Sequence, residues 1–155
     1  MKKMLLTFGT RAFSQRLAKQ FGQQFELLMA TSEEVPSFLA SKYLPIPTGL
    51  NPVFSHELLK LCLDHHIQYL LPLGLSEIQS LSATKVLFEE YGIEVLCPAS
   101  DELSDLFVIE NPNSSVVTDV YLAGQSLTSD HTLTKNISGL FSFADDEEEI
   151  ALCTI

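Results

Sequence analysis

The feature that most limits the possible folds is an alternation of short apolar runs with segments of helical periodicity. Apolar runs begin near Met4, Phe25, Ile67 and Ile93, and segments with apolar residues three or four positions apart lie between them. Strands separated by helices predict a parallel sheet with right-handed crossovers. We therefore expect an α/β fold, a three-layer Rossmann-like parallel sheet, over residues 1–110.

One short helix is expected directly after the second strand. Thr31 and Ser32 can cap a helix with their hydroxyls, and Glu33 and Glu34 would place carboxylates in its first turn. We expect this helix to run to about Ala40. The other expected helices carry Phe13, Leu17 and Phe21; Phe54, Leu58, Leu61 and Cys62; Ile78, Leu81, Phe88 and Tyr91; and a short one covers Ser100–Leu106.

The charge balance and the predicted secondary structure both change near residue 100. Residues 1–100 carry 8 basic and 9 acidic side chains, whereas residues 101–155 carry one lysine and 11 acidic side chains. We predict a small antiparallel β element in an acidic extension over residues 111–155, with the acidic run 145–149 as a hairpin loop. Its expected strands, including one that begins before that boundary, are Phe107–Ile109, Val116–Leu122, Ile137–Phe143 and Ile150–Ile155.

Composition excludes several classes of function. Nucleic-acid binding needs clustered Lys and Arg, and the acidic extension would repel a polyanion. No apolar run approaches the ~20 residues that span a bilayer, so no membrane partner is expected. The first apolar stretch is too short for a signal peptide, which favours a cytoplasmic protein. The cysteines, Cys62, Cys97 and Cys153, have no metal-ligand spacing and are expected to be buried thiols.

Candidate ligand-binding residues lie where strands of the expected sheet end. Ligands of open parallel sheets bind at the carboxyl ends of strands, and helix N-termini favour anions. The first turn offers a hydroxyl and a cation, with Arg11 as the anchor for an anionic group; the alternative is a simple turn. The candidate residues are Gly9, Thr10, Arg11, Thr31, Ser32, Pro72, Leu73 and Gly74.

No nicotinamide or other cofactor is expected at this edge. The first turn has one glycine and lacks the GxGxxG pattern. A dinucleotide site also needs an acid at the end of the second strand, where this chain has Thr31 and Ser32. Glu33 is close, but we interpret it as a helix-start residue.

Glu77 is the weak candidate for catalysis. It enters the helix that follows Pro72–Gly74, and a general acid or base there would need burial and a partner. We favour the alternative, a solvated first-turn carboxylate. No metal site is expected: His56, His65 and His66 do not share one helix face, and the run 145–149 lacks the pattern of a preformed cage.

A set of motifs in residues 4–100 keeps a recognisable order and spacing. The pieces are Leu5–Arg11, Ser41–Tyr43 before Pro45–Pro47, Ile67–Pro72 with Glu77, Lys85 with Phe88, and Tyr91–Ile93 leading to Cys97–Ser100. With these pieces, residues 4–100 resemble the N-terminal, pre-ATP-grasp domain of ATP-grasp ligases, most closely the carbamoyl-phosphate-synthetase-like and pyrrolysine-biosynthesis ligase group. The resemblance covers about two thirds of the chain.

The resemblance implies a Rossmann-like domain that packs beside an ATP-grasp module, while ATP and magnesium are held by the later domains. After Ser100 this chain has the acidic extension in place of that module. We therefore expect a stand-alone, non-catalytic module that binds a small ligand or a separately encoded ATP-grasp protein. The alternatives are a small enzyme acting on an anionic metabolite with Arg11 and Glu77, and a protein that forms homo-oligomers through its C-terminal strands.

Overall fold

The first half of the chain forms the expected parallel sheet. The structure is a computed structural model that describes residues 1–143 and 149–155. Its strands pair in the order β3-β2-β1-β4-β5, and all of these pairs are parallel. β4 is buried along its whole length and β1 is buried from Met4 to Leu6, as parallel strands covered by helices should be. The strands are β1 Lys2–Leu6, β2 Phe25–Thr31, β3 Leu44–Pro45, β4 Tyr69–Leu71 and β5 Glu94–Val95.

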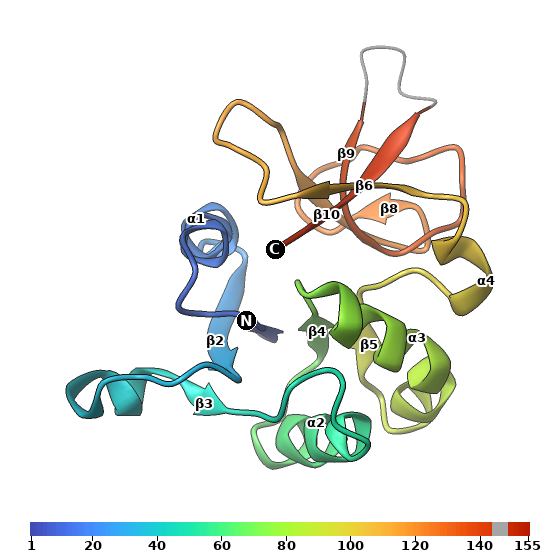
Figure 1. Cartoon of the computed structure of the whole chain (residues 1–155). Coiled ribbons are helices and arrows are strands. Elements are labelled where there is room, and N and C mark those ends of the chain that lie inside the picture. The colour runs from blue at the N-terminus through green and yellow to red at the C-terminus, as the bar shows by residue number, and fades with distance from the viewer. Residues whose placement is uncertain (144–148) are drawn as a thin grey trace.

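Helices cover both faces of this sheet, and alternate residues of β1 show which helices face which side. Leu5 packs in one buried cluster with residues of α2 (Phe54–Asp64) and α3 (Leu75–Glu90). Met4 and Leu6 pack in the other cluster with α1 (Ala12–Phe21). In Figure 1, α1 lies above β2, α2 lies below the strands, and α3 lies beside β4 and β5. The three-layer α/β prediction is therefore confirmed.

The second half of the chain forms a separate five-stranded sheet in the order β6-β10-β9-β7-β8. The sheet is mixed, because β10 pairs with β6 in parallel and with β9 antiparallel. The pairs β9–β10, β7–β9 and β7–β8 are antiparallel, as predicted, and only the β6–β10 pair of the described strands is parallel. A short helix, α4, precedes it. The elements are α4 Ser100–Leu103, β6 Phe107–Glu110, β7 Asp119–Leu122, β8 Gln125–Ser126, β9 Gly139–Phe143 and β10 Ile150–Thr154.

This second sheet packs on the same side of the parallel sheet as α1 (Figure 1). Val120, Leu140 and Cys153 join the buried cluster that holds the α1 side of β1, and Tyr121 and Phe141 join the cluster that holds Leu5. Two α1 side chains also bind backbone oxygens of the segment before β7: Arg16 Nη2 donates to Pro112 O, and Gln20 Nε2 donates to Thr118 O at 2.7 Å. The acidic extension therefore belongs to one packed body with the first half.

The helix predicted after β2 is wrong. Residues 32–36 are irregular, and only a 3-10 helix, η1 (Ser37–Lys42), follows them. The Thr31 hydroxyl accepts the Glu33 N–H at 3.0 Å, which closes a local turn instead of capping a helix. Pro36 disfavours helical backbone in the residue before it. Thr31 therefore closes a turn, and Glu33 forms an ion pair with Arg11.

Other predicted elements are present but shorter. The strand predicted from Ile67 to Pro72 contains β4, and the helix predicted over Ser100–Leu106 ends at Leu103. The predicted hairpin loop falls largely on residues 144–148, which lie outside the described residues; Glu149 is described. Among the residues that the structure describes, no helix has the length and apolar character to cross a membrane.

Candidate functional site

The turn between β1 and α1 places Arg11 against a carboxylate of the same chain. Arg11 Nε donates to Glu33 Oε1 at 2.8 Å and Nη2 donates to Oε2 at 3.0 Å, while the Thr10 hydroxyl donates to Oε1 at 3.1 Å. The hydrogen bond from Arg11 holds the pKa of Glu33 below its ordinary value, and the same pair raises the pKa of Arg11. Glu33 therefore occupies the position that we expected an anionic ligand to take beside Arg11.

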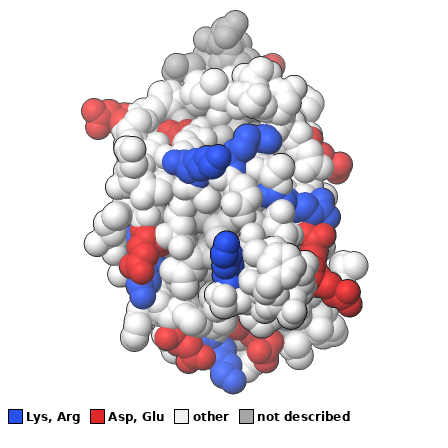
Figure 2. Space-filling model, turned by 90° about the vertical axis from the view of Figure 1, so that its left-hand side faces the viewer, with Lys and Arg blue, Asp and Glu red and all other residues white. Residues whose placement is uncertain are grey.

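The surrounding surface carries both signs of charge. On the face that presents α1, Lys and Arg side chains gather across the middle and Asp and Glu lie mainly toward the margins (Figure 2). The Arg11–Glu33 pair is itself about half exposed, with side-chain exposures of 46% and 34%. Its net charge is zero, so it gives this edge of the sheet little attraction for a free anion.

The end of β2 brings Thr31 and Ser32 to the same edge as the first turn. Thr31 is buried, and its hydroxyl accepts the Glu33 N–H, whereas Ser32 is half-buried. Gly9 lies beside them, because its N–H donates to Ala30 O at 2.8 Å. The structure therefore brings together the five candidate residues of the first two strand ends, with Glu33 between them.

The turn after β4 is covered by other parts of the chain. Pro72, Leu73 and Gly74 are all buried. Ile155 N–H, directly after β10, donates to Leu73 O at 2.8 Å, so the last strand of the second sheet lies over this turn. Gly74 is covered by the ring of Phe8, since a Cβ at Gly74 would stand 2.4 Å from Phe8 Cε2. The crevice predicted between β1 and β4 is thus filled by the chain itself.

Glu77 is buried, and the solvated carboxylate that we favoured is wrong. Its residue exposure is 1%. The Thr7 hydroxyl donates to Glu77 Oε1 at 2.5 Å and Gly74 N–H donates to the same oxygen at 3.3 Å. Oε2 is buried and has no hydrogen-bond partner among the described residues. Burial raises the pKa of Glu77 to about 7, while the bonds from Thr7 and Gly74 oppose the rise.

An open hollow of about 220 Å³ lies at the carboxyl ends of β2 and β3. Tyr43 forms one wall and packs over the first turn: a Cβ at Gly9 would stand 3.0 Å from the Tyr43 ring. Gln15 Nε2 fixes this wall by donating to Gly9 O at 2.6 Å and to the Tyr43 hydroxyl at 3.2 Å. The lining residues are Thr31, Glu33, Val35, Ala40, Tyr43 and Pro45.

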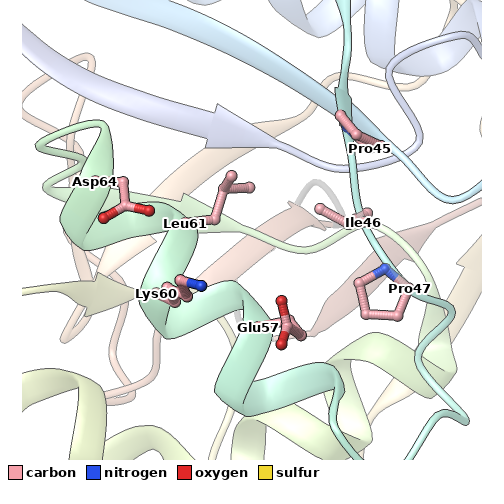
Figure 3. Close-up of a pocket in the computed structure, with 7 residues that line it drawn as sticks. All are labelled: Pro45, Ile46, Pro47, Glu57, Lys60, Leu61 and Asp64. Atoms are coloured by element: carbon pink, nitrogen blue, oxygen red, sulfur yellow. The ribbon is translucent and has the colours of Figure 1, made fainter.

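A second hollow of about 220 Å³ lies between the segment after β3 and helix α2. Figure 3 shows Glu57, Lys60 and Asp64 along α2, opposite Pro45 and its neighbours. Lys60 lies three residues after Glu57 and four before Asp64, so charges of both signs share this helix face. None of the candidate ligand-binding residues lines this hollow. We therefore take the hollow at Thr31 as the candidate ligand site.

Several lining residues of the candidate site were not singled out as ligand contacts from the sequence. Tyr43 and Pro45 belong to the motifs of the family resemblance, which assigns them no ligand contact. Val35 and Ala40 have apolar side chains that do not indicate a binding site in the sequence. The sequence predicts Glu33 as a helix-start residue, whereas the structure places it on the wall of the hollow. Pro36, three residues further on, is the signal that argued against that helix.

The cysteines and histidines add no second site. Cys62, Cys97 and Cys153 are buried and free, as predicted, and burial raises the pKa of Cys62 to about 12 and of Cys97 to about 11. Within residues 1–143 and 149–155, no group of three or more His, Cys, Asp or Glu side chains is placed to hold a metal ion.

No protein-family model matches the chain, and no curated protein matches it. The resemblance to pre-ATP-grasp domains therefore stays a prediction.

Proposed function

We propose that this chain is a non-catalytic, pre-ATP-grasp-like binding module that takes a small ligand in the hollow at Thr31. The observation that carries the proposal is the contrast between two parts of one sheet edge. The turn after β4 is closed by Phe8 and by the end of β10, whereas the hollow at the ends of β2 and β3 is open. Ligands of such sheets bind at the carboxyl ends of strands.

The lining residues suggest the chemistry of the ligand. Val35, Ala40 and Pro45 offer apolar contact, and the Glu33 carboxylate is the acceptor at the rim. Because Arg11 already pairs with Glu33, a free anion would have to compete with that carboxylate. We therefore expect a small ligand with an apolar body and at least one hydroxyl or amino donor for Glu33.

A thermal-shift screen tests the binding proposal. Nucleotides, amino acids and phosphorylated metabolites serve as probes, with neutral hydroxyl-bearing metabolites added. A ligand present at 100 times its Kd should add about 2.7 kcal/mol to the free energy of unfolding. A hit should lose its shift in Ala40→Trp, which fills the hollow, and keep it in Ala83→Trp, an exposed position on α3. A flat screen would contradict the proposal.

A small enzyme that uses Glu77 is the second candidate, because the pKa of this carboxyl lies near neutrality and Thr7 orients it. Glu77 does not line the hollow at Thr31, and for that reason we favour the binding module. Incubation of any hit with the protein separates the two candidates. Turnover that is lost in Glu77→Gln would support the enzyme, whereas binding without turnover supports the module.

A further inference from the structure

The outer strand of the second sheet, β6, presents an open edge with apolar side chains. It is the first strand in the order β6-β10-β9-β7-β8, so only β10 pairs with it in the described chain. Phe107 is 73% exposed and Val108 is 39% exposed. An exposed apolar edge strand is a ready template for pairing with another extended segment.

The direction of the free backbone groups follows from the parallel pairing with β10. Asn111 N–H, directly after β6, donates to Thr154 O at 2.7 Å. Backbone groups of successive residues in a strand point alternately to the two sides. The backbone N–H and C=O groups of Phe107 and Ile109 therefore point toward β10. Those of Val108 and Glu110 point outward, where an added strand would pair with them.

A hollow of about 460 Å³ lies beside this edge, on the face of the sheet made by β6, β10 and β9. Its walls are mostly apolar, since Phe107, Ile109, Phe143, Ile150 and Ala151 contribute to them. A strand that pairs with Val108 and Glu110 would place every second side chain over this face. Such backbone pairing gives affinity, and the side chains on the hollow give specificity.

The acidic charge around β6 distinguishes two possible binding partners, a second copy of the chain and a basic strand of another protein. Residues 101–155 carry 11 acidic side chains and one basic side chain, and two acidic residues, Glu110 and Glu149, lie on the edge strand and on the hollow. A second copy would bring the same acidic surface to the edge, and like charges across an interface disfavour association. A basic strand would meet complementary charge.

We propose that β6 is a docking edge for an extended basic segment of another protein, in which Lys or Arg alternates with apolar residues. The segment adds to β6 as a new outer strand, its backbone pairs with Val108 and Glu110, and its apolar side chains cover the hollow. This interaction surface is separate from the candidate ligand site, so the failure of either proposal leaves the other standing.

Binding of short synthetic peptides to the full chain tests this proposal. The probe is a labelled peptide of alternating Lys and Val, followed by fluorescence anisotropy, and its controls are the matching Glu–Val peptide and a Lys–Val peptide with a central proline. We expect saturable binding of the Lys–Val peptide alone, weakened by added salt. No binding of that peptide, or equal binding of the Glu–Val peptide, would overturn the proposal.

Variants of β6 show whether the peptide uses the edge. Val108→Pro removes an outward N–H that β10 does not use, so the fold should survive and peptide affinity should fall about tenfold, the equivalent of one lost hydrogen bond. Val108→Thr keeps the N–H and should bind like the unmodified chain. If Val108→Pro does not fold, Phe107→Lys gives the same test, because this exposed substitution repels the basic peptide.

Two results would contradict the proposal. Unchanged affinity in both Val108→Pro and Phe107→Lys would show that the peptide binds elsewhere. The second contradicting result would come from light scattering of the chain alone. A dimer that is lost in Val108→Pro or in Phe107→Lys would show that the edge binds a second copy of the chain. A monomer at all concentrations agrees with a heterologous partner.

Discussion

Thr7 and Glu77, 70 positions apart in the sequence, share a buried hydrogen bond of 2.5 Å between the Thr7 hydroxyl and Glu77 Oε1. The same hydroxyl accepts the Leu73 N–H at 2.8 Å. One side chain thus joins the end of β1 to the turn after β4 and to the first turn of α3. Because Ile155 binds Leu73 O, the end of the second sheet is tied to the same group.

The first prediction concerns the pH dependence of stability. Burial raises the pKa of Glu77 from an ordinary value of 4.5 to about 7, so the folded state holds a proton that the unfolded state releases. The free energy of unfolding should therefore fall as pH rises from about 4.5 to about 7, by about 3 kcal/mol at most, and level off above that range. Urea titrations across this pH range measure the fall.

Two variants isolate the part of this fall that is due to Glu77. Glu77→Gln cannot titrate, so its stability should change less over the same pH range. Glu89→Gln changes an exposed carboxyl on the same helix and should follow the unmodified chain. Equal pH dependence in Glu77→Gln and the unmodified chain would contradict the assignment.

The second prediction is that the Thr7 hydroxyl is needed both for stability and for the pKa of Glu77. Thr7→Val leaves the buried Leu73 N–H without its acceptor and should lower the free energy of unfolding by about 1–3 kcal/mol. It should also raise the pKa of Glu77 further, because the Thr7 bond holds it down. Carbon NMR of the Glu77 carboxyl measures the pKa, and Thr7→Ser should restore both properties.

The third prediction concerns the close packing of Phe8 on Gly74. A Cβ at Gly74 would stand 2.4 Å from Phe8 Cε2, so Gly74→Ala must displace the ring or the turn. We expect a loss of about 1–3 kcal/mol in the free energy of unfolding, the usual effect of overpacking. Phe8→Leu in the same chain should recover part of the loss. Additive effects of the two substitutions would contradict this contact as the cause.

The fourth prediction is that the Arg11–Glu33 pair contributes little to stability. The pair is about half exposed, and solvent screens such pairs to below about 1 kcal/mol. A double-mutant cycle with Arg11→Met and Glu33→Gln should give a coupling energy within that limit, reduced further by salt. A coupling of several kcal/mol would show that the pair is a structural element of the fold.

The order of strands and helices could be predicted because it follows from the spacing of apolar residues within short segments. Met4–Leu6 and Leu27–Ala30 are continuous apolar runs, and the spacing of Phe13, Leu17 and Phe21 matches a helix face. The segment after Thr31 could not be predicted as easily, because its helix-start signals are local and its actual partners are not. Glu33 pairs with Arg11, which lies 22 positions earlier.

By itself the sequence determined the α/β alternation, the parallel sheet and the buried cysteines, because hydrophobic periodicity and strand–helix order are properties of short segments. Only the tertiary structure decided the state of Glu77 and the shape of the site. Thr7 and Gly74 bind the Glu77 carboxyl, which is buried, and Phe8 and Ile155 cover the turn after β4, so the predicted crevice is filled. Contacts between residues far apart in the chain set the solvent exposure of each group, and exposure fixes its pKa and its access to a ligand.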